Sequence, residues 1–155
     1  MTDAARSQNA AAEPRLLEPV QVQSGPSTDP LGAAGRSGIV VDARRGRVQV
    51  LFLEDQRTIW VGNELVRRYV PESIPREHLL GFVVRFLKLF PEAGPPEIEV
   101  GVEPGVNRIM VPHGAMAVAE IDAVRAFLGD DLVAMTLAPL GMRRLSTTVA
   151  WRAGR

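Results

Sequence analysis

Short runs of β-branched residues, separated by polar turns, fill residues 36–70 and restrict this stretch to small antiparallel sheets. Apolar runs at 38–41 and 48–53 are separated by the polar, glycine-containing segment 42–46. Further runs at 57–61 and 66–70 follow polar turns at 54–56 and 62–65. Alternation of this kind places apolar side chains on one face of a strand. We therefore predict a series of short strands joined by tight turns.

The order of these residues resembles the small SH3-like barrels of the Tudor and KOW kind. The resemblance covers residues 36–71 and is carried by Gly38, Val40, Val48, Val50, Phe52, Trp60, Leu65 and Val66. It implies a small antiparallel β-barrel that binds proteins or nucleic acids. We expect Trp60 to be buried in this barrel, in which case Trp60→Ala costs about 3–5 kcal/mol of stability.

Residues 72–155 carry both helical and strand periodicity, so we predict a second, α+β domain. Ser73 is a candidate N-cap for a helix over 74–90, whose apolar residues surround most of its circumference. A hairpin of 97–102 with 108–111, a helix over 115–128 and a hairpin of 132–138 with 143–152 follow. Alternation places Ile98, Val100 and Val102 on one face of their strand, and Leu145, Thr147, Val149 and Trp151 on one face of theirs. The predicted class is thus α+β, with an SH3-like barrel before a helix-hairpin-helix-hairpin unit, which arose either by duplication or by chance similarity.

Residues 1–35 have the composition of a flexible tail. They are rich in Ala, Ser, Gln, Gly and Pro and contain only scattered large apolar residues. Such a segment buries too little surface to offset the entropy lost on ordering. The alternative is a short partner-binding motif within residues 14–17.

Composition excludes several functions. Lys and Arg number 18, as do Asp and Glu, so no net charge draws the whole chain to nucleic acid or membrane. The absence of cysteine excludes disulfides, thiolate nucleophiles and cysteine-ligated metals. The longest apolar stretch, 79–90, is interrupted by Arg85 and Lys88, so neither a signal peptide nor a membrane span is expected. We expect a cytoplasmic protein without cofactor or metal.

One candidate polar site surrounds His113, which lies between a predicted strand and a predicted helix. Loops in such positions often carry function. Asn107, Arg108 and His113 could converge near Glu120 or Asp122 to form a polar pocket. The alternative is a turn shaped by Pro112 and Gly114 from which His113 points outward.

A second candidate site is an arginine rim on the barrel. Arg44 and Arg45 lie in the first turn, Arg57 near the second, and Arg67 and Arg68 after the third, where they could flank Trp60. Aromatic and basic side chains together are typical of nucleic-acid binding. Acidic residues are interleaved with them at Asp42, Glu54, Asp55 and Glu64.

The sequence therefore leaves three functional hypotheses. The first is a non-catalytic accessory or adaptor protein that binds a protein partner or a second copy, because apolar helices and open strand edges favour association. The second is nucleic-acid binding by the arginine rim. The third is a small enzyme with its pocket at Arg108 and His113.

Overall fold

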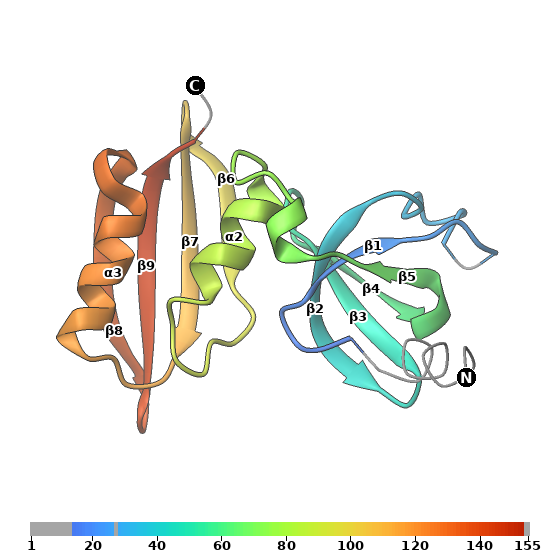
Figure 1. Cartoon of the computed structure of the whole chain (residues 1–155), viewed down its shortest axis with the longest axis horizontal. Helices are drawn as coiled ribbons and strands as arrows, with labels where there is room; N and C mark the ends of the chain where they lie inside the picture. Colours follow the sequence, from blue (N-terminus) through green and yellow to red (C-terminus); the bar gives the residue numbers. More distant parts are fainter. Residues whose placement is uncertain (1–13, 27, 154–155) are drawn as a thin grey trace. The chain divides into compact units, whose positions relative to one another are not determined.

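The computed structural model describes residues 14–26 and 28–153, and it divides the chain into two compact units, with the boundary between Ile74 and Pro75. The N-terminal unit contains a five-stranded antiparallel sheet, and the C-terminal unit contains a four-stranded one with two α-helices (Figure 1). The predicted α+β class is therefore confirmed.

The sheet of the N-terminal unit has the strand order β4-β3-β2-β1-β5. Tight turns join β2 to β3 and β3 to β4, and a 3₁₀ turn, η1, joins β4 to β5. The elements are β1 (Pro19–Val22), β2 (Ser37–Arg44), β3 (Arg47–Phe52), β4 (Arg57–Gly62), η1 (Asn63–Leu65), β5 (Val66–Arg68) and η2 (Pro71–Ser73).

Strand alternation builds the core of this unit on one face of the curled sheet. A change of register between Val40 and Asp42 marks a bulge in β2, which increases local twist and curvature. The core cluster consists of Val20, Val22, Ala33, Val40, Val48, Val50, Phe52 and Val61, all buried. These residues are nearly all β-branched, in keeping with the small space inside so curved a sheet.

Three expectations for this unit are corrected. Residues 19–22 form β1 inside the predicted tail, because Val20 and Val22 are fully buried between β2 and β5. Within the described residues, β4 pairs only with β3 and β5 only with β1, so the strands do not form a closed barrel. Trp60 is half-buried and lies opposite Gln49, on the face away from the core. The rest of the predicted tail, residues 1–13, lies outside the described part of the chain.

The C-terminal unit packs both helices against one face of a sheet with the order β6-β7-β9-β8 (Figure 1). Its elements are α2 (Leu79–Leu87), β6 (Glu97–Glu103), β7 (Val106–His113), α3 (Val118–Leu128), η3 (Gly129–Asp131), β8 (Leu132–Gly141) and β9 (Arg144–Arg152). Alternate residues of β7 and β9 are buried, which places Ile109, Val111, Thr147, Val149 and Trp151 under the helices. None of the helices in the described residues is long and apolar enough to cross a membrane.

Two details of this unit differ from expectation. α2 begins at Leu79 with His78 as N-cap, whereas Ser73 lies in a 3₁₀ turn and its hydroxyl donates to the carbonyl of Val70. In β6, Ile98 is buried but Val100 is exposed, because Gly101 has a positive φ of 70° and the register shifts between Glu99 and Glu103. The bend breaks the alternation that the sequence predicted.

Candidate functional site

His113 is a buried structural residue and does not point outward from a turn. Its Nδ1 lies 2.7 Å from the carbonyl oxygen of Gly114, and its Nε2 lies 2.7 Å from Oγ1 of Thr147. Because a carbonyl oxygen can only accept, Nδ1 carries the proton, and Nε2 accepts from the threonine hydroxyl in the neutral ring. The ring also packs on Phe90, with centroids 5.0 Å apart. Both nitrogens are therefore engaged inside the protein.

The predicted pocket of Asn107, Arg108 and His113 does not form. All three lie on β7, but Arg108 faces the open side of the sheet, where it pairs with Glu99 at 2.6 Å. Asn107 and His113 share the covered face but are six residues apart, or roughly 20 Å along a strand. Glu120 takes part in a different interaction, because its carboxylate accepts from the N–H of Ala117 at the start of α3.

The predicted arginine rim is also divided. Arg44 and Arg45 lie at the β2–β3 turn, and Arg47 beside them is paired in register with Gly62 at the end of β4. Arg57 lies at the opposite end of β4, so it does not join this group. The sequence analysis grouped these residues because a sequence does not show which strand ends lie next to one another in the sheet.

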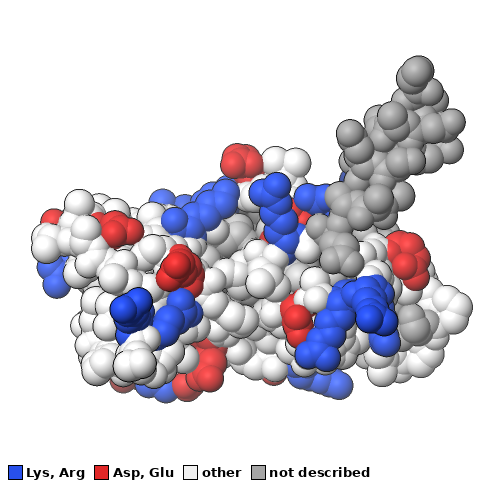
Figure 2. All heavy atoms as spheres, turned by 90° about the horizontal axis from the view of Figure 1, so that it is seen from below, with Lys and Arg blue, Asp and Glu red and all other residues white. Residues whose placement is uncertain are grey.

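Several of the arginines are already paired with carboxylates. Arg44 lies 3.4 Å from Asp42, and the Nε of Arg68 lies 2.6 Å from Glu18. No ion pair in the described part of the chain involves Arg45 or Arg67. Figure 2 shows acidic side chains among the basic ones on the face it presents. The charge pattern is therefore mixed.

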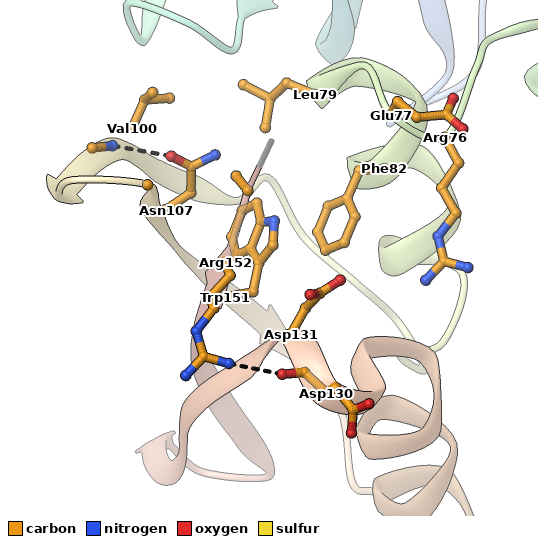
Figure 3. Close-up of a pocket in the computed structure, with 13 residues that line it drawn as sticks. Arg76, Glu77, Leu79, Phe82, Val100, Asn107, Asp130, Asp131, Trp151 and Arg152 are labelled. Atoms are coloured by element: carbon orange, nitrogen blue, oxygen red, sulfur yellow. Dashed lines mark hydrogen bonds between the residues drawn. The ribbon is translucent and has the colours of Figure 1, made fainter. Parts of the chain in front are cut away.

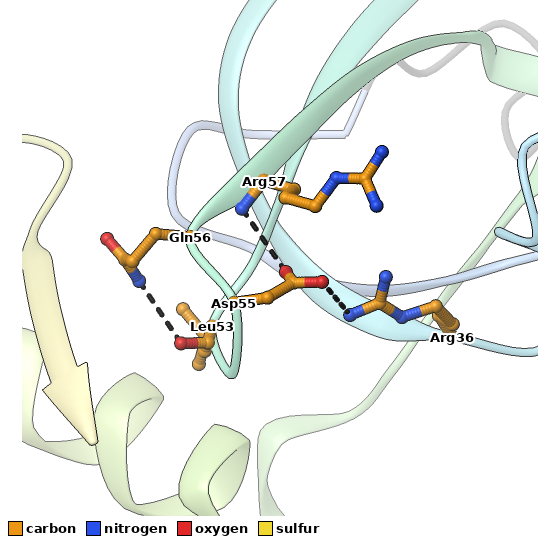
Figure 4. Close-up of polar contacts among 5 residues, drawn as sticks. All are labelled: Arg36, Leu53, Asp55, Gln56 and Arg57. Atoms are coloured by element: carbon orange, nitrogen blue, oxygen red, sulfur yellow. Dashed lines mark hydrogen bonds and ion pairs between the residues drawn. The ribbon is translucent and has the colours of Figure 1, made fainter. Parts of the chain in front are cut away.

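Asp55 shows how this mixing acts locally (Figure 4). Desolvation raises its pKa, but the N–H of Arg57, at 3.2 Å, and the guanidinium of Arg36, at 3.0 Å, outweigh that effect. The pKa of Asp55 therefore lies below its ordinary value. Ionised Asp55 therefore stabilises the fold at pH values above its unfolded-state pKa. This contribution is lost as the pH falls through the folded-state pKa of Asp55. Arg36 and Arg57 thus neutralise an acidic turn.

Arg44 and Trp60 form the best-defined basic and aromatic pair. The guanidinium carbon of Arg44 lies 5.4 Å from the centre of the Trp60 ring. Gln49 is the register partner of both Trp60 and Asp42, so this outer face carries one acid beside the cation. The pair is a small patch with a planar apolar surface and a partly neutralised charge.

Strand β8 is an exposed apolar feature that the site predictions did not include. It is an edge strand, paired only with β9 among the described residues. Its sequence, LVAMTLAPLG, has no charged residue, and Val133, Leu137 and Leu140 are exposed. Met142, in the following turn, is 94% exposed. Natural edge strands usually carry charges that prevent pairing with other chains, so this edge is unprotected apart from Pro139.

No group of three or more His, Asp or Glu side chains in residues 14–26 and 28–153 could hold a metal ion. Comparisons with protein-family models, curated proteins and solved structures found no match to this chain. The candidate sites therefore rest on their geometry alone.

Proposed function

We propose that this protein is a non-catalytic accessory protein that associates through the free edge of β8, with a second copy of the chain as its first partner. The observation that carries this proposal is a ten-residue, uncharged edge strand with exposed apolar side chains. An added strand would hydrogen-bond to the free backbone edge, and its side chains would cover Leu137 and Leu140.

Self-association follows from the symmetry of such an edge. Two copies of β8 would pair antiparallel about a two-fold axis, so that the same edge of each copy contacts the other. Because the strand has no charged residue, no like charges oppose each other in this arrangement. The two sheets would then join into one continuous sheet of eight strands, twice the four of each unit.

We expect sedimentation velocity of the full chain to show a concentration-dependent dimer. Thr136→Lys places a cation on the exposed edge, twice in the symmetric dimer, and should weaken association at least about tenfold. Ala119→Lys, on the exposed side of α3, is the matched control and should leave the dimer unchanged. A wild-type chain that stays monomeric at high concentration, or equal effects of the two variants, would refute the proposal.

The surroundings of His113 support a non-catalytic role. A general base must reach a substrate proton, whereas both ring nitrogens of His113 are bonded to Gly114 and Thr147 in the core. The enzyme hypothesis therefore loses His113, its main candidate residue.

For the N-terminal unit we propose an SH3-like fold, in an open form of the barrel. The support is the strand order, in which β1 lies between β2 and β5, so that a linear meander curls back on itself. The core on one face and the bulge in β2 favour the same curvature. This finer assignment agrees with the order of glycine and β-branched residues.

Nucleic-acid binding is a second candidate function, favoured by the contact of Arg44 with Trp60 and by the neighbouring Arg45 and Arg47. Phosphate binding weakens steeply with salt, because bound cations are released from the nucleic acid. Retention on single-stranded DNA at low salt that falls steeply with added salt, and that Arg45→Gln with Arg47→Gln removes, would establish this function. We expect no retention, because Asp42 pairs with Arg44 and offsets the charge of this group.

A further inference from the structure

A pocket of about 1030 Å³ opens at one end of the C-terminal unit (Figure 3). It lies between the N-terminal end of α2, the β6–β7 turn, η3 and the last residues of β9. This is the end of β8 remote from Leu140 and Met142, so the pocket is separate from the edge proposed for self-association. Its size is that of sites which hold an organic ligand or a few residues of a peptide.

Apolar side chains form the floor of this pocket. Phe82 of α2 stacks on Trp151 of β9, with ring centroids 4.5 Å apart and an interplanar angle of 10°. Leu79 lies beside them, and Val100, which the bend of β6 turns out of the core, is 53% exposed where it lines the same space. Trp151 is only 3% exposed, so the apolar surface open to a ligand comes from the half-buried Leu79 and Phe82 and from the exposed Val100. Burial of that surface by a ligand is favourable.

Asn107 supplies a fixed hydrogen-bond donor. The residue is only 8% exposed, and its Oδ1 accepts from the N–H of Gly101 at 3.0 Å. That bond determines the orientation of the amide, because only the oxygen can face an N–H donor. Figure 3 shows the amide oxygen of Asn107 on the dashed hydrogen bond and its nitrogen on the opposite side of the amide. Among the described residues no hydrogen bond from this nitrogen is present, so it is available to donate to an acceptor on a ligand.

The charges at the rim select the kind of ligand. Glu77, Asp130 and Asp131 carry carboxylates that form no ion pair within residues 14–26 and 28–153. The two guanidinium groups at the rim are both bonded to backbone carbonyl oxygens. That of Arg76 donates to Phe127 at 2.6 Å, and that of Arg152 donates to Asp130 at 2.9 Å. The guanidinium groups keep their positive charges, so three carboxylates against two guanidinium groups leave the rim with one net negative charge, which favours a cation over phosphate and other anions.

We propose that this pocket binds an extended peptide segment in which a large apolar residue adjoins a lysine or arginine. The apolar side chain packs on Phe82 and Val100, a peptide carbonyl accepts from Nδ2 of Asn107, and the basic side chain pairs with Asp130 or Asp131. A peptide meets all three requirements together, whereas a nucleotide would bring phosphates to an acidic rim.

The first test uses two defined probes, the peptides acetyl-Gly-Phe-Arg-Gly-amide and acetyl-Gly-Phe-Glu-Gly-amide. The full chain with Trp60→Phe leaves Trp151 as its only tryptophan, so fluorescence reports directly on the pocket. We expect saturable binding of the arginine peptide and at least about tenfold weaker binding of the glutamate peptide. Equal binding of the two peptides, or no saturable change with the arginine peptide, would overturn the proposal.

Variants locate the binding site. Asp130→Asn combined with Asp131→Asn should weaken the arginine peptide severalfold, whereas Asp122→Asn, an exposed acid of α3 outside the pocket, should not. Val100→Arg should block the pocket, and Val102→Arg, which lies in the same strand but does not line it, is the control. All five positions are exposed, so these changes should leave the fold intact. Unchanged affinity of both pocket variants would place the peptide elsewhere and refute the site.

Discussion

Replacing Phe86 with alanine is expected to lower the free energy of unfolding of the C-terminal unit by about 3–5 kcal/mol. Phe86 is fully buried on α2, and its ring contacts three other aromatic rings, those of Phe82, Phe90 and Phe127. The centroid distances to these rings are 5.7, 5.1 and 5.9 Å. Alanine would remove all three contacts and leave a cavity that neighbours held by a helix and a sheet cannot fill.

Urea unfolding followed by the fluorescence of Trp151, in a chain with Trp60→Phe, measures this loss in the C-terminal unit. The midpoint should fall while the slope with urea stays constant, which shows that the change is one of stability. Val118→Ala is the control, because Val118 is 74% exposed and should change stability by no more than about 0.5 kcal/mol. A loss for Phe86→Ala as small as that of the control would mean that the aromatic cluster is not the core.

Residue alternation was sufficient to predict most strands but not their ends or edges. The runs at 48–53 and 57–61 are observed as β3 and β4. Each run has enough apolar residues on one face for a strand to be predicted from it alone. β1 was missed since it has only four residues, PVQV, within a segment of polar composition. Its burial comes from pairing with β2 and β5, which are distant in sequence.

Trp60 illustrates a limit of the same reasoning. Its size predicted a place in the core, yet the register with Gln49 turns it to the outer face. Because the adjacent Val61 is buried, alternation along the strand correctly places Trp60 on the opposite, outer face. We accordingly expect Trp60→Ala to cost less than a fully buried aromatic residue does. The phase of a strand, rather than the type of residue, decides what is buried.

The candidate sites were harder to predict, because they depend on which elements meet. Arg108 and His113 are near in sequence but lie on opposite faces of β7. Asn107 is near both, yet its partner is Gly101 across the β6–β7 turn, and its pocket is completed by Phe82 and Trp151. Only the alternation along β7 carried a signal for this separation. The residues that complete the pocket come from other elements and had no local signature.

The pair of His113 and Thr147 is expected to show strong energetic coupling. Thr147→Val removes the hydroxyl that Nε2 of His113 needs, and should cost about 1–3 kcal/mol because a buried acceptor is left without a donor. His113→Leu leaves the Thr147 hydroxyl and the Gly114 carbonyl without their partner and should cost a similar amount. The double variant replaces both side chains of the bond by apolar ones, so its cost should be smaller than the sum by about 1–2 kcal/mol.

Measuring all four proteins by urea unfolding gives the coupling energy, and nitrogen NMR of His113 gives the ring state directly. We expect a proton on Nδ1, held by the carbonyl of Gly114, and none on Nε2, which accepts from Thr147. The NMR result distinguishes a buried structural histidine from a catalytic one, because a catalytic base must be able to exchange its proton with solvent between reaction cycles. Additive costs together with a proton on Nε2 would instead contradict the bond to Thr147 and reopen the enzymatic hypothesis.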